Sequence, residues 1–203
     1  MIAIVDYDMG NVASVANMLK RVGAPESVLT RDPDVLRRAD KVILPGVGAF
    51  DKGMRNLAEF GLLEALNEAA TERRVPILGI CLGMHLLTKS SEEGQLDGLG
   101  WIDAQTVRFR FPENSGLKVP HMGWNYVEAR RGNPLIPAGK RSRFYFVHGY
   151  YVTCNREEDT IGMASYGFDF ACAVNHDNVF GVQFHPEKSH RFGMALLDGF
   201  VRL

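Results

Sequence analysis

The sequence predicts a three-layer α/β fold, in which helices cover both faces of a mostly parallel central sheet and the C-terminal half is rich in strands. Up to about residue 94, short apolar runs alternate with segments of helical periodicity, which is typical of parallel strands buried on both faces. Beyond that point, short strand-like segments are separated by Gly, Asn, Asp and Pro. With 203 residues, 46% of them hydrophobic, the chain can bury a large core, and we expect one domain over 1–203.

The N-terminal half is predicted to contain three strand–helix repeats. Its apolar runs are short and continuous, and the helical segments between them carry apolar residues every three or four positions. Gly23 is expected to stop the first helix. We expect strands over 2–5, 27–29, 41–44 and 76–80, and helices over 12–22, 33–39 and 57–70.

The C-terminal half is predicted to consist mainly of short strands followed by one helix. We expect strands over 101–107, 124–128, 144–147, 150–152, 161–164, 170–174 and 179–183, and a helix over 189–201. The segment 130–143 is basic and contains Gly and Pro, and it is interpreted as a solvated surface loop.

Composition excludes several classes of protein. Twenty-three basic against 24 acidic residues give a net charge of −1, so no overall field favours nucleic acid or an anionic membrane. The three cysteines, Cys81, Cys154 and Cys172, are too widely spaced for a disulfide framework or a zinc site, and we expect no metal and no cofactor. The sequence shows no export signal or membrane-spanning run, and the predicted compartment is the reducing cytoplasm.

Cys81 is the candidate nucleophile. It follows the buried strand 76–80 without any loop residues, and Gly79 and Gly83 flank it two positions away on each side. A nucleophile between small neighbours is typical of a tight strand-to-helix turn that exposes the reactive atom. A helix expected to start at about Leu82 would place its positive dipole end beside the sulfur and favour the thiolate.

His185 is the candidate acid and base, and Glu187 is the candidate group that orients it. Pro186 favours an extended backbone at His185, so the side chains at 185 and 187 are expected on the same side. His85 is a rival base because it lies four residues after Cys81 on the same predicted helix. His185 is preferred because no residue next to His85 in the sequence would orient its ring.

Acyl chemistry also needs hydrogen-bond donors for the oxyanion that forms on the substrate carbonyl. The backbone amide of Leu82, directly after the nucleophile, is one candidate. The glycine-rich turn after the neighbouring strand, with Val47 and Gly48, is the other. A Pro-Gly-x-Gly turn is a weak signal alone and gains meaning only beside Cys81.

Taken together, these segments resemble the class I, triad-type glutamine amidotransferases, and most closely the glutaminase subunits of imidazole glycerol phosphate synthase. The similarity covers essentially the whole chain. It is carried by GICLG at 79–83 and GVQFHPEKS at 181–189, together with DYDMGN at 6–11, PGVG at 45–48, PHMGWN at 120–125 and YFVH at 145–148. The resemblance implies the three-layer fold of that family.

The resemblance also implies a function. Glutamine would be hydrolysed through a thioester on Cys81, and the ammonia would pass to a HisF-like (β/α)8-barrel synthase subunit that forms imidazole glycerol phosphate and AICAR in histidine biosynthesis. Glutamine would be held near Gly48, His85 and Tyr150. The interface of the resulting heterodimer would include Asn11, Trp124, Tyr145 and Lys188, with Trp124 and Tyr145 near the ammonia exit.

The sequence departs from the usual family pattern at Asp8, His85 and Gly149, where glycine, glutamine, and serine or threonine are more common. Because a neutral imidazole donates only one hydrogen bond, His85 is expected to bind glutamine more weakly than Gln would. Three alternatives remain open. They are a paralogue that supplies ammonia for amidination of a nucleotide-linked acetamido sugar in lipopolysaccharide synthesis, a catalytically silent binding subunit, and a cysteine peptidase or related hydrolase.

Overall fold

The structure is a computed structural model, and it describes residues 1–24, 26–137, 139 and 141–203. The described strands form one mixed sheet in the order β2-β1-β3-β4-β12-β11-β10-β7-β8. Its first five strands are parallel neighbours, as expected for strands joined through helices. These are β1 (Ile2–Val5), β2 (Ser27–Thr30), β3 (Lys41–Gly46), β4 (Ile77–Cys81) and β12 (Val179–Val182). The predicted α/β fold class is confirmed, and the parallel part consists of the N-terminal strands and β12.

The strand-rich C-terminal half extends the same sheet in antiparallel fashion. Beside β12 lie β11 (Asp169–His176), β10 (Thr160–Ser165), β7 (His121–Ala129) and β8 (Ser142–His148), and β9 (Tyr150–Cys154), β6 (Ala104–Arg108) and the short β5 (Ser90–Ser91) branch off β11. β5 was not among the predicted strands, because two residues are too few to show a period. The strands predicted for this half are all present, with ends that differ from the predicted ones by up to three residues.

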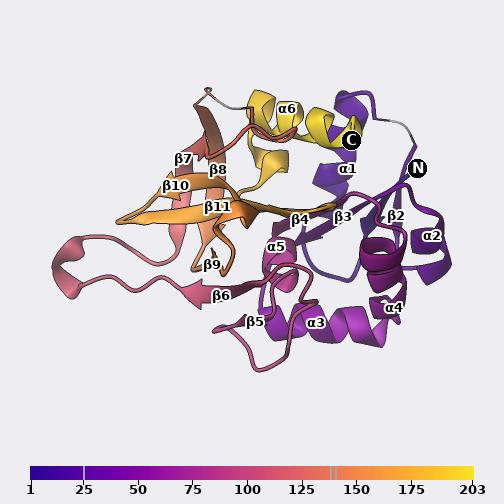
Figure 1. The fold of residues 1–203 in the computed structure, drawn as a ribbon, viewed down its shortest axis with the longest axis horizontal. Coiled ribbons are helices and arrows are strands. Elements are labelled where there is room, and N and C mark those ends of the chain that lie inside the picture. Colours follow the sequence, from indigo (N-terminus) through magenta and orange to yellow (C-terminus); the bar gives the residue numbers. More distant parts are fainter. Residues whose placement is uncertain (25, 138, 140) are drawn as a thin grey trace.

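Helices cover both faces of the sheet and complete the three layers (Figure 1). α1 (Val12–Arg21) and α6 (His190–Val201) lie together on one face, and α2 (Pro33–Arg38), α3 (Phe50–Glu59), α4 (Leu63–Asn67) and α5 (Leu82–Leu86) lie on the other. β1 divides its side chains between the two layers: Ile2 and Ile4 join the core under α1 and α6, and Ala3 and Val5 join the opposite core.

The predicted single helix over 57–70 is wrong. Its first part belongs to α3, which already begins at Phe50, and the chain then turns at Gly61, whose φ is +66°. The Leu62 N–H donates to the Leu57 carbonyl across this turn, in the pattern of a glycine helix end. α4 and the π-helix η1 (Glu68–Glu72) follow as separate pieces. A periodicity that continues across a glycine therefore hid a helix end.

The interpretation of 130–143 as a solvated loop is also wrong in part. Leu135 and Ile136 are 2% and 1% exposed and belong to the core beneath α6. The Asn133 side chain accepts hydrogen bonds from the backbone N–H groups of both residues, which compensates for lost water at this turn. Positions 138 and 140 of this segment lie outside the described residues.

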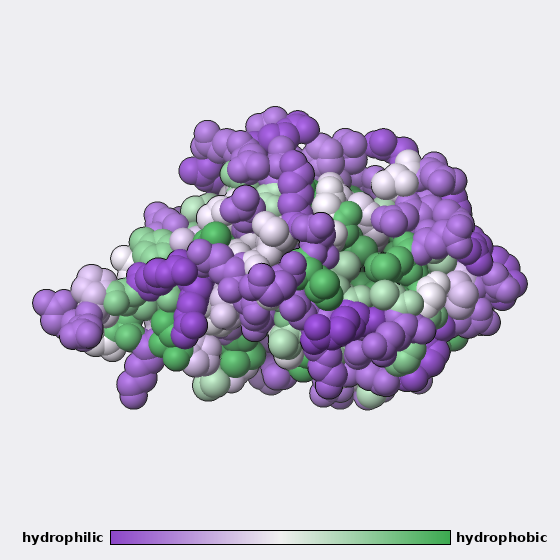
Figure 2. All heavy atoms as spheres, turned by 90° about the horizontal axis from the view of Figure 1, so that it is seen from below, coloured by the Kyte–Doolittle hydropathy of each residue, from purple (hydrophilic) through white to green (hydrophobic). Residues whose placement is uncertain are grey.

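Figure 2 shows a mostly hydrophilic face, on which hydrophobic residues gather in separate patches. Among the described residues, no helix is long and apolar enough to cross a bilayer. The 3₁₀ turns η2 (Glu113–Ser115), η3 (Glu157–Asp159) and η4 (Pro186–Lys188) connect strands and helices, and η4 leads from β12 to α6. The expected last helix begins at His190, one residue later than predicted.

Candidate active site

Three neighbouring parallel strands end together and position the site. In the sheet register, Gly46 at the end of β3 lies beside Cys81 at the end of β4, and Val182 of β12 lies beside Ile80. The turn after β3, the Cys81 turn and the segment leading to His185 therefore meet at the carboxyl edge of the sheet. This edge is where ligands bind in open α/β sheets.

The Cys81 turn is a strained strand-to-helix connection. Cys81 has φ +54° and ψ −109°, is 7% exposed, and α5 begins at the next residue. A Cβ atom on Gly83 would lie 1.8 Å from the Leu44 carbonyl oxygen, and one on Gly79 would lie 2.7 Å from the Gly83 carbonyl oxygen. Both flanking glycines are thus required by close backbone packing. The predicted turn is present.

His185 and Glu187 form a buried pair. His185 Nδ1 lies 2.8 Å from Glu187 Oε1, and the two side chains are 2% and 5% exposed. The backbone of His185 is fixed because its N–H donates to the Tyr145 carbonyl and its carbonyl accepts from the Ser189 hydroxyl. His185 Nε2 is buried and, within the described part of the chain, has no hydrogen-bond partner of good geometry.

The environment of His185 favours its protonated form. Burial lowers its pKa, but the interactions with Cys81 and Glu187 outweigh burial and raise the pKa of His185 to about 9. Because Glu187 binds Nδ1, the other nitrogen, Nε2, is the one available to Cys81. The pair is therefore arranged to hold a proton next to the sulfur and to exchange it there.

A cavity of about 270 Å³ opens beside Cys81. It includes the residues predicted for the oxyanion hole and for glutamine, and its lining consists of Val47, Gly48, Cys81, Leu82, His85, Glu93, Pro120, Val147, His148, Gly149 and Tyr150. Glu93 is a lining residue that no local sequence pattern marks. Its carboxylate accepts from the Phe50 backbone N–H at 3.0 Å, and burial raises its pKa.

A chain of buried imidazoles supports one wall of this cavity. His148 Nδ1 lies 2.7 Å from the Tyr150 carbonyl, and because a carbonyl only accepts, Nδ1 carries the hydrogen. His148 Nε2 therefore accepts from His121 Nδ1 at 2.9 Å, and His121 Nε2 accepts from the Asn125 amide at 3.3 Å. Burial lowers the pKa of His121 to about 4 and the pKa of His148 well below its usual value. Both rings are therefore neutral and hold one tautomer.

His85 has a different partner from the one that a Cys81–His85 dyad requires. Its Nε2 lies 2.8 Å from Gln183 Oε1, and burial lowers the pKa of His85 to about 4. Gln183 is fully buried, and its amide nitrogen lies 4.0 Å from Cys81 Sγ. No local sequence pattern singles out Gln183, because its two partners lie 98 and 102 residues away, at His85 and Cys81.

Three of the four predicted interface residues lie together next to His185. The Trp124 and Tyr145 rings meet edge to face at 6.2 Å between centroids, and Lys188 Nζ lies 5.7 Å from the Tyr145 centroid. Asn11 lies apart in sequence and caps α1 by accepting from the Ser14 N–H, and α1 packs against η4. Trp124 and Tyr145 thus form an aromatic group next to the His185 backbone, which is hydrogen-bonded to Tyr145.

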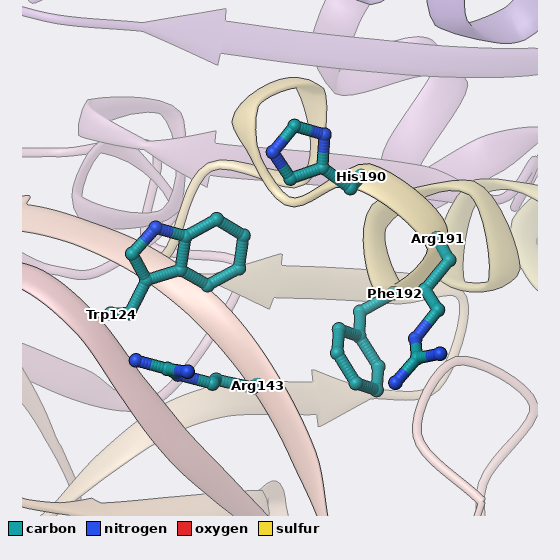
Figure 3. A pocket seen from close by; sticks show the side chains of 5 residues that line it. All are labelled: Trp124, Arg143, His190, Arg191 and Phe192. Atoms are coloured by element: carbon teal, nitrogen blue, oxygen red, sulfur yellow. The ribbon is translucent and has the colours of Figure 1, made fainter.

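A second cavity adjoins this aromatic group (Figure 3). Its lining comes from two neighbouring strands and the start of α6, and consists of Trp124, Arg143, His190, Arg191 and Phe192. The His190 ring is parallel to Trp124, with 5.6 Å between centroids, and the Arg143 guanidinium lies 5.6 Å from the Trp124 centroid. This face is accordingly both aromatic and basic.

A strained cysteine, an imidazole–carboxylate pair interacting with it and an adjoining cavity form an arrangement that is suited to nucleophilic attack by a thiolate on a carbonyl. The profile of the family "Glutamine amidotransferase class-I" matches residues 3–202, and the chain belongs to this family. Relatives named imidazole glycerol phosphate synthase subunit HisH 2 are 52% identical in Methanococcus maripaludis and 50% identical in Pseudomonas aeruginosa. Each alignment covers 100% of this chain and 99% or 100% of the relative.

The fold also matches a solved structure described as a glutamine amidotransferase. The TM-score is 0.77 at 18% sequence identity, and the match covers 100% of both chains. At this identity the likeness concerns the fold, and it agrees with the mixed sheet and its two helical layers.

Proposed function

We propose that this chain is a HisH-type glutaminase subunit that hydrolyses L-glutamine to glutamate through a thioester on Cys81. Its ammonia passes to a HisF-like (β/α)8-barrel subunit, which forms imidazole glycerol phosphate and AICAR in histidine biosynthesis. The full-length similarity to relatives named imidazole glycerol phosphate synthase subunit HisH supports the pathway. The observation that carries the chemistry is the strained Cys81 beside the buried His185–Glu187 pair.

In the first half of the reaction, the Cys81 thiolate attacks the carboxamide carbon of glutamine. A carbon–sulfur bond forms and the carbonyl oxygen becomes an oxyanion. When the carbonyl re-forms, the carbon–nitrogen bond breaks, and protonated His185 delivers its Nε2 proton to the leaving nitrogen. Because the pKa of His185 is raised to about 9, this proton is in place at neutral pH.

In the second half, His185 is neutral and acts as base. It takes a proton from water as the water oxygen attacks the thioester carbon, and the carbon–sulfur bond then breaks to return the electron pair to Cys81. Glutamate leaves, and the proton on His185 restores the starting pair. Glu187 holds the ring orientation through both halves by accepting from Nδ1.

The cavity supplies the binding groups. The backbone amides of Leu82 and of the Val47–Gly48 turn form the oxyanion hole, and the amide of Leu82 suits this role because the first N–H groups of a helix lack helical partners. Gly48, His85 and Tyr150 surround the substrate. The Glu93 carboxylate in the same lining is suited to the α-ammonium group of glutamine.

The partner docks over the aromatic group beside His185, with Trp124, Tyr145 and Lys188 in the interface and Asn11 at its margin. This placement gives ammonia a short route from the sulfur to the barrel.

The proposed hydrolysis of glutamine needs no metal or cofactor. We place the two subunits in the cytoplasm, where the free cysteines Cys81, Cys154 and Cys172 remain reduced.

The test measures glutamate release by the purified chain alone and with a HisF-like barrel subunit from the same organism. We expect slow release alone and a strong increase with the liganded barrel, because a mobile turn at Val47–Gly48 would gate the oxyanion hole. Full activity of the isolated chain would contradict gating. Absence of release under both conditions, with no labelling of Cys81 by a diazo-ketone glutamine mimic, would indicate a silent binding subunit.

Co-purification identifies the acceptor pathway. A barrel that converts the histidine-pathway substrate supports the proposal, whereas a barrel that amidinates a nucleotide-linked acetamido sugar would assign the chain to the lipopolysaccharide pathway. The glutaminase steps are the same in both cases, so this experiment tests the pathway separately from the chemistry.

A further inference from the structure

Gln183 contacts the sulfur of the proposed nucleophile, and it is not part of the lining of the cavity beside Cys81. It directly follows β12, and its side chain is fully buried. Its backbone N–H donates to the Cys172 carbonyl at 2.9 Å, which fixes the position of the residue. The side-chain amide extends between His85 and Cys81, with Oε1 at 2.8 Å from His85 Nε2 and Nε2 at 4.0 Å from Cys81 Sγ.

The direction of these two contacts follows from charge and tautomer. His85 is neutral, because burial lowers its pKa to about 4, so its ring carries a single N–H. If that N–H is on Nε2, Gln183 Oε1 accepts it and the NH₂ group points to the sulfur. The flipped amide would place its oxygen against the sulfur, which a thiolate opposes electrostatically.

We propose that Gln183 is a further catalytic residue that donates an N–H to the Cys81 thiolate, and that His85 is a positioning residue that locks the Gln183 amide in this donating orientation. The proposal rests on the proposed nucleophilic role of Cys81. The donated hydrogen bond stabilises the sulfur anion before attack and again when the thioester carbon–sulfur bond breaks. It vanishes in the thioester itself, where sulfur is neutral.

The assignment also changes the expected role of His85 toward substrate. Its Nε2 hydrogen is used on Gln183, so only Nδ1 remains for the cavity that His85 lines, and this nitrogen accepts. His85 is therefore expected to accept a hydrogen bond from glutamine through Nδ1, rather than to donate one.

The test follows the pH dependence of Cys81 alkylation by iodoacetamide in the isolated full-length chain. Peptide mass spectrometry reports Cys81 separately from Cys154 and Cys172. Gln183→Met keeps the length of the side chain and removes the donor. Because hydrogen bonds to a charged group are the stronger ones, we expect the alkylation midpoint to rise by about one pH unit. An unchanged midpoint would overturn the proposal.

A matched pair at position 85 tests the positioning role. His85→Leu removes the group that holds the amide, and we expect a smaller rise of the midpoint in the same direction. His85→Gln provides an amide N–H at the same place, and we expect it to bring the midpoint back toward the original value. Equal midpoints in His85→Leu and His85→Gln would refute the role of His85.

This pair also keeps the proposal testable if Gln183→Met fails to fold, which thermal unfolding would reveal. In that case a midpoint in His85→Leu equal to that of the unmodified chain counts against both roles. Alkylation requires neither glutamine nor a partner. A chain without glutaminase activity that still shows these shifts would contradict the proposed function and leave the Gln183 contact standing.

Discussion

The molecule contains buried imidazoles of two kinds within one site. His185 is 1% exposed, and its pKa is raised to about 9, whereas His85 and His121 are 5% and 4% exposed, with pKa values lowered to about 4. Burial acts in the same direction on all three rings. The difference arises because His185 interacts with the Cys81 sulfur and the Glu187 carboxylate, while the other two rings form hydrogen bonds only with neutral amides or imidazoles.

This contrast separates two tasks. The charged ring can give and take a proton at the sulfur, which the proposed reaction requires. The neutral rings hold fixed tautomers, so each bond they make has a defined direction and keeps the cavity wall in place. The Cys81 sulfur and the Glu187 carboxylate are what distinguish His185, the proposed acid and base, from the supporting histidines.

Removing the Cys81 sulfur is expected to have the largest effect on the difference between His185 and the neutral histidines. Cys81→Ala is expected to lower glutamate release by the chain and its partner by about 10⁴-fold or more, because the group that forms the thioester is lost. His185 should at the same time lose part of its raised pKa, since Cys81 contributes to it. The measurements are steady-state glutamate release and an NMR titration of the His185 ring. Release that survives in Cys81→Ala would refute the assigned nucleophile.

Removing the charge of the Glu187 carboxylate should lower the pKa of His185 toward the values of the neutral histidines. Glu187→Gln keeps the shape but removes the charge, and we expect a loss of about 10³- to 10⁴-fold in kcat, with the pKa of His185 lowered. The exposed Glu157→Gln serves as matched control and should leave both unchanged. A His185 titration identical in Glu187→Gln and the unmodified chain would contradict the argument.

The two kinds of ring predict opposite slopes of stability with pH. His185, raised above its ordinary 6.5, contributes stability that is complete below pH 6.5 and is lost as the pH rises through about 9. His85 and His121, lowered from 6.5, contribute stability that is complete above pH 6.5 and is lost as the pH falls toward 4. Each contribution is on the order of 3 kcal/mol.

Urea unfolding at a series of pH values measures this effect, and the maximum is expected near pH 6.5. The Glu187→Gln variant should flatten the alkaline side alone, whereas His85→Gln should flatten part of the acid side. A stability curve whose alkaline side is the same in Glu187→Gln would refute the assignment of that slope to His185.

The smallest expected effect concerns the hydrogen bonds that link His121, His148 and the Tyr150 carbonyl at one wall of the cavity. His148→Phe removes the donor to the Tyr150 carbonyl and leaves His121 without its acceptor. We expect the KM for glutamine to rise about tenfold with a smaller change in kcat, and stability to fall by about 1–3 kcal/mol. A larger loss in kcat than in glutamine affinity would point to a role in the chemical step instead.

The predictable parts of the site are those that a short stretch of sequence defines. The Cys81 turn was evident from two glycines and a buried strand, and the orientation of His185 toward Glu187 follows from two residues on one extended backbone. Parallel strands were evident from continuous apolar runs. Their carboxyl ends meet at one edge, and this brought the turn at Gly48 next to Cys81.

The remaining parts depend on contacts between distant segments. Gln183 acquires its position from His85, 98 residues away, and the His121–His148 bond joins residues 27 apart on two strands. Glu93 reaches the cavity from a turn with no distinctive pattern. The break at Gly61 is hidden in the sequence because the apolar period continues across it. The burial of Leu135 is hidden because tertiary packing outweighs a polar neighbourhood.

The backbone at Cys81 places folding and reactivity in competition at a single position. A φ of +54° costs an ordinary residue on the order of 1–3 kcal/mol and costs glycine almost nothing. A library of variants selected only for resistance to heat should therefore accumulate glycine at position 81, although every such chain would lack the proposed nucleophile. Selection for turnover, rather than for stability, is then what would keep cysteine at this position.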